Sequence, residues 1–135
     1  MEKDELNKIL IEHIEWTEGR GGRQADLSEA NLRQADLTRA NLTGADLPSP
    51  TILLLADWGE VSDKLCTKLM RYDASNHPEP SKFDDWAKGG ECPYTDSHWE
   101  RAANFKEKKE LWKAGEAKSA LELVMMLFNE KNIKR

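Results

Sequence analysis

The chain lacks long hydrophobic runs, and it has little cysteine. Its apolar stretches, such as residues 52–56, are far shorter than the roughly 18 residues that a membrane-spanning helix needs. The first residues are acidic and show no apolar leader, so we expect a cytoplasmic protein without a cleaved secretion signal. Cys66 and Cys92 are the two cysteines, and in a chain of this kind we expect free thiols.

Motifs for catalysis, for metal binding and for phosphate binding are also lacking. Cys92, His98 and His77 do not show the paired spacing of a structural zinc site. No serine or cysteine lies in a recognisable nucleophile motif with a histidine base, and the glycine pairs are not followed by the Lys-Ser/Thr of a phosphate loop. We therefore expect no catalytic residue, no cofactor and no metal, and interpret the protein as not an enzyme.

Charge is spread unevenly along the 135 residues. The chain has 25 acidic and 20 basic residues, a net charge of −5, whereas residues 101–135 alone carry a net +4. A mildly acidic chain is not typical of proteins that bind nucleic acid directly, whose domains are strongly basic. The lysines of residues 101–135 are interpreted as a solvent-exposed helix face, and a local basic patch is the alternative. They are Lys106, Lys108, Lys109, Lys113 and Lys118.

A repeat of five residues is the dominant feature that is present. From residue 25, successive units read Ala, then Asp or Asn, then Leu, followed by two variable residues. A period of five fits neither a helix nor a strand, so the pattern predicts a chain that turns a corner in every unit, with Ala and Leu inside. These core positions are Ala25, Ala30, Ala35, Ala40 and Ala45 together with Leu27, Leu32, Leu37, Leu42 and Leu47.

The units resemble the pentapeptide repeat family, whose members build a right-handed quadrilateral β-helix. The resemblance implies an α+β fold with a short β-helix of this kind over residues 20–58. An N-terminal capping helix over 1–19 and a small α-helical C-terminal region over 59–135 complete the predicted domains. Residues 56–58 look like a further unit displaced by one residue. Because so few units make fewer than two coils, the flanking segments must cover both ends of the leucine column.

Hydrophobic spacing and capping residues predict the flanking elements. We expect an amphipathic helix over 3–18, a buried strand over 52–55, a helix over 62–73, and a short helix that is capped by Ser81 and ends at Gly89. The pairs Ser97 with Glu100 and Ser119 with Glu122 form capping-box patterns, which predict helices starting near 98 and 120.

Three classes of function remain open. The first is a non-enzymatic protein-protein interaction module that presents a rigid surface to a partner protein. The second follows from the resemblance, since some pentapeptide repeat proteins imitate B-form DNA: an inhibitor of a topoisomerase or of a CRISPR or restriction nuclease, encoded by a phage or mobile element. The repeat itself is short and neutral, so such mimicry is expected in the acidic residues 57–100. The third is an enzyme with its site in the helical region.

We place the partner surface within residues 73–100, where acidic side chains, tryptophans and proline-containing loops come together. The partner is expected to be a protein, with neither nucleic acid nor a membrane bound directly. Whether the chain is a monomer or a homodimer stays open. The predicted binding residues are Asp84, Asp85, Trp86, Glu91 and Trp99. Most of the five tryptophans are expected to pack in the core, and the alternative is that one or two of them, Trp99 or Trp112, anchor a partner surface.

Overall fold

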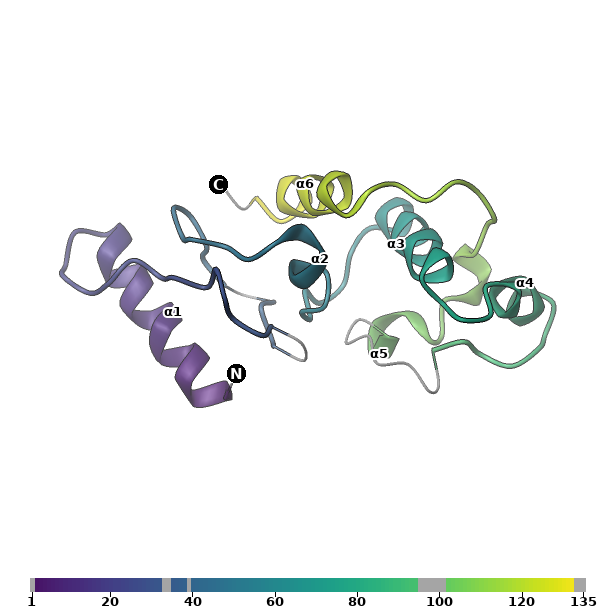
Figure 1. Ribbon diagram of the computed structural model, residues 1–135, viewed down its shortest axis with the longest axis horizontal. Helices are drawn as coiled ribbons and strands as arrows, with labels where there is room; N and C mark the ends of the chain where they lie inside the picture. Colours follow the sequence, from purple (N-terminus) through teal and green to yellow (C-terminus); the bar gives the residue numbers. More distant parts are fainter. Residues whose placement is uncertain (1, 33–34, 39, 95–101, 133–135) are drawn as a thin grey trace.

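The computed structural model describes residues 2–32, 35–38, 40–94 and 102–132. The molecule is elongated, with α1 (Lys3–Thr17) at one end and the repeat segment beside it (Figure 1). The remaining helices lie toward the other end. In chain order these are α2 (Pro50–Leu53), α3 (Asp63–Ser75), α4 (Ser81–Ala87), α5 (Ala102–Phe105), the 3-10 helix η1 (Lys109–Leu111) and α6 (Ala120–Glu130).

A tight turn closes each five-residue unit of the repeat. The backbone amide of the alanine that opens the next unit donates a hydrogen bond to the carbonyl of the leucine three residues earlier, at 2.9–3.2 Å. This turn occurs at Ala30, Ala35, Ala40 and Ala45. The period seen in the sequence is therefore the period of the turns.

The Asp or Asn at the second position of a unit shapes the same corner. One carboxylate oxygen of Asp26 accepts hydrogen bonds from the hydroxyl of Ser28 (2.6 Å) and from its amide (3.1 Å). These bonds lower the pKa of Asp26, the hydroxyl more than the amide. Side-chain oxygens of Asp36, Asn41 and Asp57 accept from the amide two residues later in the same way. A short side chain with an acceptor oxygen is needed here, which explains why this position is either Asp or Asn.

After 20 residues the repeat segment comes back beside its first unit. The amide of Leu27 donates to the carbonyl of Asp46 (2.7 Å), and the amide of Asp46 donates to the carbonyl of Ala25 (2.9 Å). Isolated parallel β-bridges pair Asp26 with Asp46 and Asp36 with Asp57. The first pair is separated by 20 residues and the second by 21, which agrees with a final unit displaced by one residue.

The β-helix expected from the resemblance is not confirmed. In the part of the chain that the structure describes, these two bridges are the only β pairing, and no extended strand forms. Most of the regular structure is helical. The repeat is thus a succession of tight turns that meets itself at two places, and the flanking helices supply the bulk of the fold.

Side chains of the repeat form a column inside these turns. Four leucines are at most 2% exposed, namely Leu27, Leu32, Leu37 and Leu42. Leu47, at the end of the column, is half-buried. Ala25 and Ala35 are buried because their carbonyls join the paired coils, whereas Ala30, Ala40 and Ala45 are half-buried.

The strand predicted over 52–55 is wrong, because this segment begins with the short helix α2. Ser49 is extended and its carbonyl accepts hydrogen bonds from the amides of Ile52 (3.1 Å) and Leu53 (3.0 Å). Pro50 occupies the first helical position, where its fixed φ suits a helix and its missing amide costs nothing. This short helix places the side chains of Leu53 and Leu54 in the core.

α1 covers one end of the repeat, as the apolar spacing predicted. Leu6 is buried, and Ile9 and Leu10 are packed against the core. His13 is fully buried and bridges two segments of the repeat: its Nδ1 accepts from the amide of Ala25 (2.9 Å), and its Nε2 lies 2.8 Å from the carbonyl of Thr43. The helix is therefore fixed to the repeat by hydrogen bonds as well as by apolar contact.

α6 lies over the other side of the repeat, beside α2 and α3 (Figure 1). Trp58, at the end of the repeat, meets Phe128 of α6 edge to face with ring centroids 5.6 Å apart. The amide of Ser62 donates to the carboxylate of Glu130 at 2.8 Å. The C-terminal helix thus returns to close the surface that the repeat leaves open.

The predicted helix starts agree with the structure at two places and differ at a third. Ser62 begins α3 and accepts from the amide of Leu65, and Ser119 begins α6 and accepts from the amide of Glu122. Ser81 does not cap α4: it is the first helical residue, and Pro80 precedes it. The capping box at residues 97 and 100 lies outside the described residues.

Candidate functional site

A groove of about 280 Å³, open to solvent, lies on the surface of the helical region. Three segments form its walls: the C-terminal half of α3, the beginning of α4, and the extended chain that follows η1. They contribute Arg71, Ala74, Ser75, Pro80, Ser81, Asp84, Trp112, Ala114, Gly115 and Ala117. The groove therefore combines an aromatic ring, both signs of charge and small side chains.

Hydrogen bonds hold the two largest side chains of the groove in place. The indole Nε1 of Trp112 donates to a carboxylate oxygen of Asp84 at 2.9 Å. The guanidinium Nε of Arg71 donates to the carbonyl of Lys113, also at 2.9 Å. Arg71 packs so close to Gly115 that a Cβ there would lie 2.8 Å from the guanidinium carbon. Both side chains are thus oriented before any ligand arrives.

Aromatic packing behind the groove supports its tryptophan. Trp112 lies against Phe83, with ring centroids 5.0 Å apart. Phe83 in turn contacts Trp86 and Tyr94 edge to face, at 6.3 and 5.5 Å. The Tyr94 hydroxyl donates to the buried carboxylate of Asp73 at 2.8 Å. This aromatic cluster is the core of the helical region and the support of the groove.

The structure does not bring the five predicted binding residues together. Asp84 lines the groove, whereas Asp85 and Glu91 are exposed and do not line it. Trp86 is 3% exposed and belongs to the aromatic cluster, so its ring does not face a partner. Trp99 lies outside the described residues. Asp84 is the predicted binding residue that lines the groove, and Trp112, which the sequence offered as an alternative to a core position, lines it as well.

Sequence reasoning missed Arg71 and Gly115. The signal for Arg71 was present, because it falls on the side of the predicted helix opposite to Leu65 and Leu69. Gly115 lies in a segment without periodicity, and its contact with α3 joins residues 44 positions apart in the chain. Only the folded chain reveals that contact.

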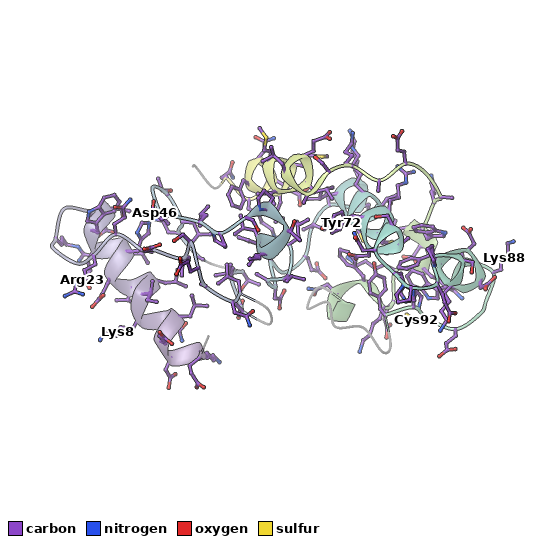
Figure 2. All side chains as sticks on the ribbon, in the orientation of Figure 1. Lys8, Arg23, Asp46, Tyr72, Lys88 and Cys92 are labelled. Carbon is purple, nitrogen blue, oxygen red and sulfur yellow. The ribbon has the colours of Figure 1, made fainter. Side chains whose placement is uncertain are left out.

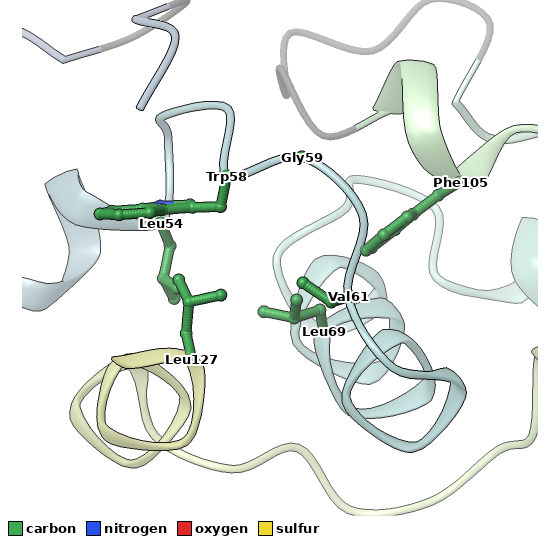
Figure 3. A pocket seen from close by; sticks show the side chains of 7 residues that line it. All are labelled: Leu54, Trp58, Gly59, Val61, Leu69, Phe105 and Leu127. Carbon is green, nitrogen blue, oxygen red and sulfur yellow. The ribbon is translucent and has the colours of Figure 1, made fainter. Parts of the chain in front are cut away.

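A second cavity is a packing gap and does not offer a ligand site. It measures about 10 Å³ and lies between α3, α5, α6 and the end of the repeat (Figure 3). Leu54, Trp58, Leu69, Phe105 and Leu127 are among its apolar lining residues. A space of about 10–15 Å³ can just hold one water molecule, and a water needs polar partners that these side chains lack.

The described residues offer little for covalent or metal chemistry. Cys66 is fully buried, and desolvation raises the pKa of its thiol from 9.0 to about 11, so it stays protonated at neutral pH. Cys92 is half-buried and its thiol faces the carbonyl of Lys106. Within the described ranges no three His, Cys, Asp or Glu side chains gather as metal ligands. His98, the third member of the set considered from the sequence, lies outside those ranges.

Several acidic residues of the stretch 57–100 have structural roles. Asp57 accepts from the amide of Gly59 at 2.9 Å and from the side-chain amide of Asn104 at 3.4 Å. Asp73 is fully buried. Asp84 orients Trp112. These three acids therefore do not contribute to a free, DNA-like track.

Residues 23–48 match the protein-family model described as Pentapeptide repeats (8 copies). The turns and their period define the same class, and the chain contains pentapeptide repeats in this segment. Such domains are generally protein-interaction modules and generally non-enzymatic. Searches of the curated proteins and of the solved structures returned no match to the chain. Every helix in the described ranges is too short or too polar to span a membrane.

Proposed function

We propose that the protein is a non-enzymatic interaction module that takes up part of a partner protein in the groove between α3, α4 and residues 112–117. The observation that carries this proposal is the preorganised pair of Trp112 and Arg71. Tryptophan and arginine are enriched among the residues that dominate binding energy, and fixing them in advance lowers the entropy lost on association.

The position of the repeat supports this assignment. α1 and α6 cover its two sides, and its inward leucines are buried. What remains accessible is a set of corners whose Asp and Asn side chains are engaged in their own turns. The repeat then acts as a rigid support, and recognition falls to the helical region.

The test begins with the capture of a partner from lysate and its identification by mass spectrometry. Two folded variants are then compared in a binding assay with the purified partner. Ala114→Arg adds a large side chain at an exposed wall of the groove, and Thr43→Arg adds the same group at an exposed corner of the repeat. Both variants raise the net charge equally, so charge alone cannot explain a difference between them.

We expect Ala114→Arg to weaken binding and Thr43→Arg to leave it unchanged. The opposite pattern would show that the repeat is the recognition surface. Equal affinity for both variants and the unmodified protein would place the partner elsewhere. Circular dichroism and thermal melts check that each variant is folded.

The alternative of a DNA-processing enzyme inhibitor makes a different prediction about the partner. The sequence places such mimicry in the acidic residues 57–100, whose exposed acids include Asp63, Asp85 and Glu91; Asp46, labelled in Figure 2, belongs to the charge-neutral repeat. This alternative predicts a topoisomerase or a nuclease as the captured protein and competition with duplex DNA. A partner of another class would exclude it.

A further inference from the structure

A row of cations follows the solvent-facing side of α3 toward the groove. Lys64, Lys68 and Arg71 are spaced by four and three residues, which places them on one face of the helix. The buried residues Leu65 and Leu69 belong to the other face. The row ends at the groove, because Arg71 is one of its lining residues.

Lys118 joins this row from the other side. The extended segment 112–119 runs from η1 past α3 to α6 (Figure 1), and Gly115 of this segment contacts Arg71. Partial desolvation lowers the pKa of Lys68, and the charges of Lys64, Lys118 and Arg71 lower it further. Four cations from two segments therefore repel one another across a small area.

Little of this positive charge is neutralised within the molecule. Lys118 lies 3.8 Å from the carboxylate of Glu122, with both side chains largely exposed. In the described part of the chain, no carboxylate lies within ion-pair distance of Lys64, Lys68 or Arg71. An anion placed over the row would relieve this repulsion, because an opposite charge nearby stabilises the charged form of each cation.

We propose that Lys64, Lys68, Arg71 and Lys118 bind an acidic, extended segment of a partner protein. This inference rests on the proposed function of the groove and names the chemistry of its occupant. Carboxylates of the segment pair with the row on α3, and a neighbouring apolar side chain enters the groove beside Trp112. Charge complementarity fixes the direction of the segment, because Asp84 on the opposite wall excludes a second acid there.

The same charges disfavour nucleic acid as the occupant. The row runs from Lys64 to Arg71 of α3, a distance of about 10 Å along the helix axis at a rise of about 1.5 Å per residue. Nucleic-acid binding draws its affinity from many phosphate contacts over a longer basic surface. Asp84 and the acidic remainder of the protein repel a phosphate backbone. An acidic peptide needs only the short row and the groove.

The experiment measures the fluorescence anisotropy of a labelled peptide of three glutamates, one leucine and three glutamates. A peptide with glutamine in place of glutamate and a labelled short duplex DNA serve as comparison probes. The full chain is compared with Lys64→Gln/Lys68→Gln and with the control Lys3→Gln/Lys8→Gln, which removes the same charge from α1. Lys8 lies at the far end of the molecule (Figure 2).

We expect the acidic peptide to bind more tightly than both comparison probes. The α3 variant should weaken it about fivefold or more, because two ion pairs of surface strength are lost. The α1 variant should change it less than about twofold, since long-range effects of exposed charges are screened by salt. No binding of the peptide, equal weakening by both variants, or tighter binding of the duplex would each overturn the inference.

Gly115→Ala tests Arg71 without changing any charge. The new Cβ would lie 2.8 Å from the guanidinium, which sits at the end of a flexible side chain and must move away. Peptide binding should fall while the melting temperature stays close to that of the unmodified chain. Unchanged binding would remove Arg71 from the site. If the natural partner is sensitive to Ala114→Arg but indifferent to Lys64→Gln/Lys68→Gln, the groove function stands and only its acidic occupant is wrong.

Discussion

Replacing His13 by leucine is expected to loosen α1 from the repeat. The imidazole is fully buried, yet each ring nitrogen has a partner on the coil: the amide of Ala25 and the carbonyl of Thr43. Because Nδ1 accepts from an amide, it carries no proton, and the neutral ring donates from Nε2. Leucine keeps much of the apolar contact with the coil and removes both hydrogen bonds.

The size of the effect follows from what each partner loses. Ala25 is 2% exposed, so its amide is left unsatisfied in the core, at about 1–3 kcal/mol. Thr43 is exposed and its carbonyl can bind water instead, so that bond contributes about 0.5–1.5 kcal/mol. The stacking of His13 on Trp16, with ring centroids 5.4 Å apart, is also lost. We expect His13→Leu to lower the free energy of unfolding by about 2–4 kcal/mol.

Urea unfolding followed by tryptophan fluorescence measures this loss, and the half-exposed Trp16 reports on the region directly. Gln24→Ala is the matched control: the side chain of Gln24 donates to the carbonyl of Gly44 in the same region, but the bond is exposed. The control should cost less than about 1 kcal/mol. If His13→Leu costs no more than the control, the histidine does not fix the helix and the reasoning is refuted.

Four further outcomes test the fold. Gly22→Ala should lower the melting temperature more than Gly21→Ala. Both residues have a left-handed φ, but only at Gly22 would an added Cβ clash with the backbone of α1. Equal losses for the two variants would contradict this close approach. Leu37→Ala should cost about 2–5 kcal/mol in urea melts, and a loss below about 1 kcal/mol would remove this side chain from the column. Ser119→Ala should cost about 1 kcal/mol in the same assay through loss of the helix cap, and no change would show that the cap is not needed. The folded state keeps the proton of Cys66 where the unfolded chain loses it, so the contribution of this thiol to stability should be complete below pH 9.0 and be lost as the pH rises to about 11. That loss should be absent in Cys66→Ala, and an identical pH profile for the two proteins would contradict the raised pKa.

Features that depend on neighbours in sequence could be predicted well. The leucine period gives the turn spacing because each turn is closed by a bond between residues three apart. The starts of α3 and α6 followed from Ser62 and Ser119, whose side chains cap amides in the first turn. These contacts are local, so the residue types and their spacing contain the information.

Features that depend on contacts between distant segments could not be predicted. The error over residues 52–55 has a different origin, because the signal for a helix is local: Pro50 suits the first helical position, but the apolar run was interpreted as a buried strand. Trp86 was predicted to be a surface anchor, but its side chain packs in the aromatic core beside Phe83. The groove likewise depends on the meeting of α3 with a segment about 40 residues later in the chain. Periodicity says nothing about such pairings.

The balance between support and recognition in this chain follows from the shortness of its repeat. A long repeat stack has many outward-facing corners between its two covered ends. Here the repeat makes one coil and the beginning of a second, and both of its sides are covered by helices. Covering helices need their own apolar faces, and α3 needs a further core of Phe83, Tyr94 and Phe105 behind it. That second core is what positions Trp112 and Arg71 at the surface. In our proposal, the segments recruited to close the repeat thereby supply the binding groove, so a variant that loosens α1 should lower stability while leaving the affinity of the folded protein for its partner unchanged.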